Sequence, residues 1–154
     1  MSLFENSDYR WRETCFVMLP TNARPQVDAI RDQLGSVFEI GEVESDGGGL
    51  VTMTLYSPND FSAMDVCYVE GEEVLEQMED LLNELKQGAI DPEELSKLPE
   101  IANSTARIDV LHFERVMAGT DEEFLDPGSL LLVLEQLAKI CDGIGVDPQS
   151  GTIL

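Results

Sequence analysis

Residues 106–116, Ala-Arg-Ile-Asp-Val-Leu-His-Phe-Glu-Arg-Val, are the stretch that decides the fold. The run is rich in β-branched, leucine and phenylalanine side chains, so it predicts a strand apolar enough to be central in a sheet. An acidic loop at 119–125 follows it. Asp126 and Pro127 then form a typical helix start, and an apolar helix is predicted over 127–141.

The predicted helix at 127–141 has almost no polar side. One sheet face covers only one stripe of a helix, so the remaining apolar surface is expected to meet either a helical insert or a second subunit. We therefore expect self-association, at least to a homodimer, through this helix or through a sheet edge. Its large apolar residues are Leu130, Leu131, Leu132, Val133, Leu134, Leu137 and Ile140.

The rest of the chain predicts short strands and amphipathic helices. Val51, Met53 and Leu55 alternate with polar residues, which is typical of a half-buried strand. Pro25 and the Asp91–Pro92 pair are typical of helix starts. The predicted strands are 13–19, 36–44, 50–56, 64–69, 106–116, 144–147 and 151–154, and the predicted helices are 25–35, 72–87, 91–101 and 127–141.

These elements predict an α+β fold with an antiparallel or mixed sheet and helices packed on one face. Residues 13–56 and 106–154 share one order: strand, proline-initiated helix, glycine stop, strand, polar turn, strand. That order favours a ferredoxin-like arrangement of two related strand-helix-strand-strand units with a helical insert. We expect a single domain over 1–154, with a first half at 10–70, the insert at 71–104 and a second half at 105–154.

Charge restricts the partners that the protein can have. The chain holds 31 Asp and Glu against 9 Lys and Arg, a net charge of −22. Such a field repels nucleic-acid phosphates and anionic membranes and attracts cations and basic proteins, so we expect no nucleic-acid and no membrane partner. The chain is 43% hydrophobic and its acids are interspersed, which indicates a folded protein with either a solubilising surface or a surface for a cationic partner.

The three cysteines, Cys15, Cys67 and Cys141, lie in apolar surroundings. Their spacing is typical of neither a metal site nor a redox pair, so we expect reduced thiols and predict no metal and no cofactor. The N-terminus does not resemble a signal peptide, and no run reaches membrane-spanning length, which favours a cytoplasmic protein.

Residues 42–47, Glu-Val-Glu-Ser-Asp-Gly, resemble the first half of a calcium loop. Such a loop needs a bidentate carboxylate at its twelfth position, where this chain has Met53, and helices on both sides, where this chain predicts strands. We therefore expect an acidic hairpin tip at these residues.

Four residues form the candidate site of the sequence: Arg12, Asp65, Asp109 and His112. Asp65 and Asp109 each lie in an apolar strand, where a carboxylate must point to water or find a partner. Arg12 and Arg107, which lie on or beside predicted strands, are scarce cations that could pair with them. His112 is the only histidine, so general-base chemistry would require it, although a hydrogen-bonded structural histidine is the commoner outcome.

Trp11, between Arg10 and Arg12, is a weak candidate for partner binding. Tryptophan and arginine are common at the centre of interfaces, and a tryptophan at such a position also often covers the edge of a core.

The leading functional interpretation is a non-enzymatic protein-interaction or regulatory domain with an acidic surface. The alternative is a small-ligand-binding protein or enzyme that uses Asp65, Asp109 and His112 in a sheet cleft; a nucleic-acid mimic is a third class. A perturbed carboxylate in a concave pocket would favour the alternative. The sequence predicts no catalytic residues outright, and it favours a protein that is not an enzyme.

Overall fold

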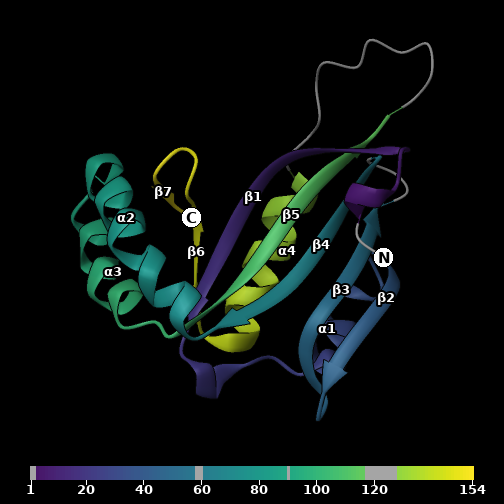
Figure 1. The fold of residues 1–154 in the computed structure, drawn as a ribbon, viewed down its shortest axis with the longest axis horizontal. Coiled ribbons are helices and arrows are strands. Elements are labelled where there is room, and N and C mark those ends of the chain that lie inside the picture. Colours follow the sequence, from purple (N-terminus) through teal and green to yellow (C-terminus); the bar gives the residue numbers. More distant parts are fainter. Residues whose placement is uncertain (1–2, 58–60, 90, 117–127) are drawn as a thin grey trace.

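The computed structural model describes residues 3–57, 61–89, 91–116 and 128–154, which form one antiparallel sheet with the strand order β2-β3-β4-β5-β1-β6-β7 (Figure 1). The strands are β1 Tyr9–Leu19, β2 Glu39–Asp46, β3 Gly49–Ser57, β4 Ser62–Glu70, β5 Ala106–Arg115, β6 Ile144–Asp147 and β7 Thr152–Ile153. The helices are α1 Val27–Leu34, α2 Glu72–Gly88, α3 Pro92–Ala102 and α4 Gly128–Cys141, with 3-10 turns η1 Leu3–Glu5 and η2 Thr21–Ala23. The predicted α+β class is confirmed.

Strand β5 lies in the interior of the sheet, as its apolar sequence predicts. It pairs with β4 on one side and with β1 on the other, antiparallel in both cases. Side chains along a strand alternate between the two faces. Ile108, Val110 and His112 therefore lie on one face of the sheet, and Arg107, Asp109 and Leu111 lie on the other.

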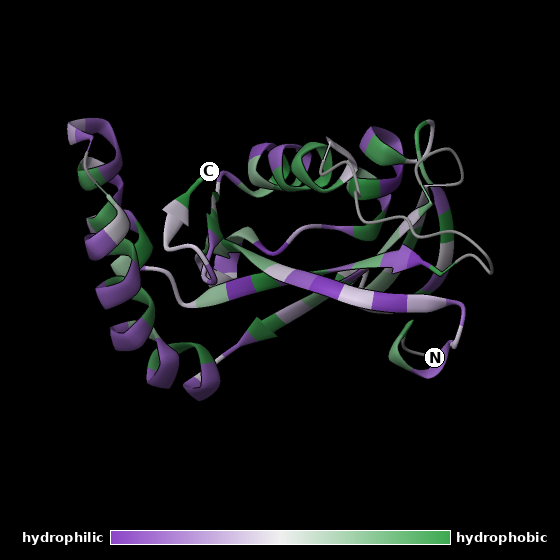
Figure 2. Ribbon diagram, turned by 90° about the horizontal axis from the view of Figure 1, so that it is seen from above, coloured by the Kyte–Doolittle hydropathy of each residue, from purple (hydrophilic) through white to green (hydrophobic). Residues whose placement is uncertain are grey.

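One face, which we call the α4 face, carries α1 and α4. Leu130, Val133, Leu134 and Leu137 of α4 pack with α1 and with the inward residues of the sheet in the largest buried apolar cluster. Ile30 and Leu34 give α1 its buried side. Helix α4 is the most uniformly hydrophobic of the helices in Figure 2, where it lies along one side of the sheet.

The opposite face, which we call the strip face, is covered at its two ends by helical segments of the described residues. Val74, Met78, Leu81 and Leu85 of α2 pack over Met18 in a second apolar cluster at one end. Leu3 of η1 packs with Ala63 and Phe113 at the other end. The prediction that the helices share one face is therefore wrong for α2, because Met18 points away from the core that its neighbours Val17 and Leu19 enter.

Several boundaries differ from the sequence prediction by one to four residues, and two of the differences bear on the sheet. Strand β1 begins at Tyr9 rather than at residue 13, because β5 supplies pairing partners as far as Arg115. The hairpin between β2 and β3 has a tighter turn than expected: only Gly47 and Gly48 stand outside the strands, with φ angles of 59° and 84°. Positive φ at both positions is what a two-residue hairpin turn requires.

Other predicted features stand as follows. Asp91 caps α3 by accepting a hydrogen bond from the backbone N–H of Glu93 at 2.9 Å, as its position predicts. The acidic loop at 119–125 and the helix start at Asp126 and Pro127 lie outside the described residues. The ferredoxin-like arrangement and the two-unit plan stay predictions. Among the described helices, each is too short or too polar to cross a lipid bilayer.

The burial of α2 on the strip face gives a matched test of the second apolar cluster. Leu85→Ala removes a fully buried side chain and is expected to lower the free energy of unfolding by about 2–5 kcal/mol. Leu75→Ala removes a side chain of the same helix that is 58% exposed, and its expected cost is below about 0.5 kcal/mol. Urea unfolding of the two variants measures both. Equal losses would contradict the placement of α2.

Candidate binding face

The strand registers align the side chains of the strip face in rows that cross the sheet. Two rows lie between the cluster under α2 and the cluster under η1, and we call these two rows the open strip. At its margins Phe16 packs against the α2 cluster, and Asp65 is hydrogen-bonded to Leu3 of η1. The first row is Glu44, Thr52, Cys67, Asp109 and Phe16. The second row is Thr54, Asp65, Leu111 and Thr14.

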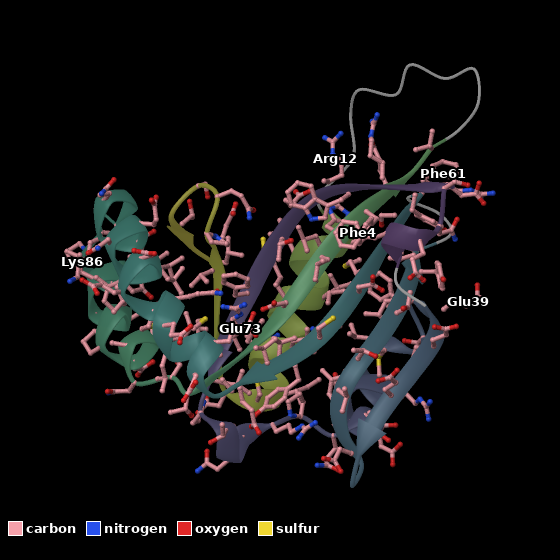
Figure 3. All side chains as sticks on the ribbon, viewed as in Figure 1. Phe4, Arg12, Glu39, Phe61, Glu73 and Lys86 are labelled. Atoms are coloured by element: carbon pink, nitrogen blue, oxygen red, sulfur yellow. The ribbon has the colours of Figure 1, made fainter. Side chains whose placement is uncertain are left out.

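The two walls of the open strip come from segments far apart in the sequence. Glu73 lies at the start of α2 on one side, and Phe4 of η1 lies on the other, where its ring meets the ring of Phe113 edge-on at 4.9 Å (Figure 3). In Figure 2 the N-terminal 3-10 turn lies on the side of the sheet opposite α4. The open strip is therefore bounded at both ends and faces away from the main core.

Asp65 connects the open strip to the N-terminal segment. It is buried, and its two carboxylate oxygens accept hydrogen bonds from the backbone N–H of Leu3 and the hydroxyl of Thr54, both at 2.9 Å. These bonds offset the cost of burying a carboxylate and hold η1 against the sheet. Asp65 therefore has a clear structural role, which agrees with the requirement that a buried carboxylate find partners.

Asp109 is paired with Arg107, as the scarcity of cations predicts. The Nε atom of Arg107 lies 2.7 Å from Oδ1 of Asp109, and the guanidinium also contacts Gln77 and stacks on the ring of Phe16 at 4.5 Å. Burial raises the pKa of Asp109, and the hydrogen bond and charge of Arg107 oppose that rise. Arg107 is itself buried, so its charge is committed to Asp109 and the nearby Glu73.

An acidic cavity of about 240 Å³ lies in the part of the open strip formed by β2, β3 and β4. Its carboxylates are Glu42, Glu44 and Asp65, and Cys67 lies among them. Burial, with the charges of Asp65 and Asp109, raises the pKa of the Cys67 thiol to about 11. The thiol is therefore protonated at neutral pH, and the chemistry of the cavity is that of an oxygen-rich anionic surface.

A second cavity of about 240 Å³ lies where the other end of the open strip meets α2, and we call it the apolar cleft. Phe16 and Met18 of β1 and Met78 and Leu81 of α2 line it. Asp80 and Glu84 of α2, both exposed, also border it. The open strip therefore runs from an acidic cavity to an apolar one.

His112 lies on the α4 face and is 1% exposed. Its Nδ1 atom lies 3.3 Å from Oε2 of Glu13, and among the described residues its Nε2 atom has no hydrogen-bond partner. Burial lowers the pKa of His112 from its ordinary 6.5, while the charge and hydrogen bond of Glu13 act in the opposite direction. Near neutral pH the imidazole is therefore uncharged.

The structure divides the four predicted site residues into two pairs. Asp65 and Asp109 share the open strip. His112 lies on the opposite face, and Arg12 lies beside it, with Nη1 3.3 Å from Oε1 of Glu114, which also pairs with Arg10. Arg12 thus neutralises Glu114 rather than either aspartate. The sheet separates the two pairs, so the four residues do not form one site.

Trp11 lies on β1 rather than before it, opposite Phe113 and next to a register shift at Arg12. Its side chain is 43% exposed, and its indole N–H donates to the hydroxyl of Thr14 at 3.0 Å. It therefore lies beside the open strip, on the side where η1 packs.

Comparison of the chain with protein-family models, with curated proteins and with solved structures gives no match in any of the three. The functional argument therefore depends on the site alone.

The sequence analysis identified Asp65 and Asp109 but not the other residues that line the open strip and its two cavities. Glu42 and Glu44 were considered only as part of a calcium loop, and Phe16 and Met18 only as part of a buried strand. A signal was present for the threonines, because the alternation in β3 places Thr52 and Thr54 on the face opposite Met53 and Leu55, which enter the main core. Their row partners on β4 and β5 depend on register, which alternation does not specify.

The buried, neutral His112 predicts a pH effect on stability. In the unfolded chain His112 takes up a proton near pH 6.5, whereas in the folded protein its lowered pKa delays protonation to lower pH. The free energy of unfolding should therefore fall as the pH drops below about 6.5. The slope is limited to about 1.4 kcal/mol per pH unit, the value for one proton. Urea unfolding between about pH 7.5 and 5.5 measures it.

His112→Gln is the control for this prediction, because an amide hydrogen-bonds without titrating in that range. The raised pKa of Asp109 acts in the opposite sense at lower pH, and it is present in both proteins, so it cancels in the comparison. The variant should lose less stability than the wild type over this range. Identical slopes would contradict an uncharged His112.

Proposed function

We propose that the protein is a non-enzymatic interaction domain whose open strip binds a basic segment of a partner protein. The observation that carries the proposal is the charge of the strip and its margins: five carboxylates, from Glu42, Glu44, Asp65, Asp109 and Glu73, accompany a single guanidinium. That guanidinium, of Arg107, is already paired. A basic segment would therefore meet an excess of negative over positive charge on the strip and its margins.

The arrangement of the carboxylates supports binding over acid–base catalysis. Asp65 is engaged by Leu3 and Thr54, and Asp109 by Arg107, while the only histidine lies on the other side of the sheet. Catalysis by a carboxylate and an imidazole needs both within reach of one reacting group. The residues that the catalytic alternative needs therefore do not lie together in one site. As the place of action in the cell we still propose the cytoplasm.

The test is binding of a fluorescent oligolysine peptide. About six residues span the five strands from β2 to β1, since strands are about 4.8 Å apart and an extended chain covers about 3.4 Å per residue. Glu42→Gln with Glu44→Gln should weaken binding about fivefold, the effect of losing two exposed ion pairs. Fluorescence anisotropy measures it, and added salt should weaken binding further.

The matched control is Asp28→Asn with Asp32→Asn. It removes the same charge from exposed positions of α1, which packs on the α4 face. This variant should bind nearly as well as the wild type. An equal loss in both double variants would show attraction by net charge alone, and no binding to the wild type would refute the function.

We propose further that the protein is a homodimer associated through α4. The insert helix α2 packs on the strip face, so it does not cover the outer side of α4, where Leu131 is 47% exposed. A groove of about 530 Å³ lies there, bordered by Leu131, Ala138 and Leu154. The charged residues of α4 are Glu135 and Lys139, which pair at 3.0 Å, whereas α2 has six acids and one lysine. Two copies of a chain with a net charge of −22 repel each other least through a surface on which positive and negative charges balance, as they do on α4.

Leu131→Asp tests this dimer. The wild type should scatter light as a particle of twice 17.0 kDa, and the variant should stay folded at 17.0 kDa because Leu131 is not part of the core. Leu75→Asp, the same change at an exposed site of α2, should stay dimeric. A wild-type particle of 17.0 kDa would end the dimer proposal.

A further inference from the structure

The apolar cleft is a feature of the strip face that the binding of basic residues by carboxylates would not use. Phe16 lines it as a partly buried ring, and Met78 and Leu81 of α2 line it as side chains that are 8% and 9% exposed. Its volume of about 240 Å³ has room for one large side chain rather than for a helix. Methionines, which adapt to the shape of what they touch, form two of its sides through Met18 and Met78.

The cleft is built into the fold by the close packing of α2. A Cβ atom on Gly88 would lie 2.2 Å from the carbonyl oxygen of Gly151, so only glycine lets the end of α2 approach the turn between β6 and β7. Pro148 of the same turn lines the cleft. The cleft therefore has walls on β1, on α2 and on this turn, and a ligand would find it largely formed.

Charge complementarity defines the occupant. Asp80 and Glu84 at the cleft are exposed acids of α2, and Arg107, the cation that lines it, is committed to Asp109 and Gln77. A second copy of this acidic chain would be repelled by that rim, and the charge-neutral surface of α4 lies on the opposite face. An apolar side chain flanked by lysine or arginine would satisfy both the apolar walls and the acidic rim.

The cleft is continuous with the open strip. Phe16 is the last member of the first row, which begins with Glu44 on β2 and passes through Cys67 and Asp109. The same ring is a wall of the cleft. A segment that crosses the sheet along this row therefore passes from the acidic cavity to the apolar cleft without leaving the surface.

We infer that the partner segment is amphipathic: a basic run with one large apolar side chain that enters the apolar cleft as an anchor. This inference rests on the proposed function, and it adds the specificity that oligolysine binding lacks. The basic residues supply long-range attraction and the acidic cavity supplies their ion pairs, whereas the anchor selects among basic segments.

The experiment compares two fluorescent peptides, an oligolysine that ends in Gly-Phe and the same oligolysine that ends in Gly-Ser. The phenylalanine peptide should bind the wild-type protein about tenfold more tightly or better, the gain from burying one aromatic side chain. Both peptides should bind the Glu42→Gln, Glu44→Gln variant more weakly than the wild type, since both use the acidic cavity.

Two protein variants locate the anchor. Phe16→Ser removes a wall of the cleft, and Gln77→Trp places a large ring at an exposed α2 position that lines it. In each folded variant the advantage of the phenylalanine peptide should shrink to about twofold or less, as expected when one partner of a contact is lost. Phe61→Ser, the same change at an exposed aromatic outside the cleft, should keep the full advantage.

The outcomes separate the two proposals. Equal binding of the two peptides to the wild type, with both weakened by Glu42→Gln and Glu44→Gln, overturns the anchor and leaves the proposed function standing. An advantage that survives both Phe16→Ser and Gln77→Trp also overturns it, because the anchor then lies elsewhere. Failure of both peptides to bind refutes the proposed function and the anchor together.

Discussion

The antiparallel pairing of β1 with β5 is the constraint on which the rest of the structure depends. It joins residues 9–19 to residues 106–115, close to a hundred positions apart, and it places both strands in the interior of the sheet. Two-residue alternation then sends Val17 and Ile108 into the main core and Phe16 and Asp109 to the strip face. A one-residue slip would exchange these sets, placing a paired aspartate in the core and aliphatic side chains in the strip.

That pairing also explains why the scarce cations lie where they do. Nine cations cannot neutralise 31 acids, and a buried carboxylate without a partner is costly, so the cations are needed most beside buried carboxylates. Arg10 and Arg12 pair with Glu114 across the two strands, and Arg107 pairs with Asp109 along β5. The other acids of the described ranges lie mainly on exposed positions, where water solvates them and where they build the field that the proposed partner would meet.

Local sequence patterns predicted the elements well, because each strand and helix has a clear apolar period and a recognisable start or end. Strand β6 and helix α2 lie within one residue of their predicted bounds. The face covered by α2 was not predictable in this way. An amphipathic helix shows which of its sides is buried, but the crossover that delivers it to one face or the other depends on loops and on the whole sheet.

The candidate site shows the same division between local and long-range information. Asp109 and His112 are three residues apart in one strand, and an odd separation places them on opposite faces, so the sequence held enough information to separate them. That Asp65 joins Asp109 depends on the register of β4 against β5, which no local pattern specifies. The acidic cavity and the apolar cleft depend on still more, because each combines side chains from three or more elements.

The two proposed surfaces lie on opposite faces of the sheet, and this has an energetic consequence. A dimer formed through α4 would leave both open strips accessible, so the two kinds of binding would not compete for residues. They would still be linked, because a basic segment bound on each strip lowers the charge that opposes association of the two copies. Linkage is reciprocal, so association would in turn strengthen the field that attracts each segment. Salt would weaken the attraction of the segments and relieve the repulsion between copies, which makes ionic strength act on the two equilibria in opposite directions.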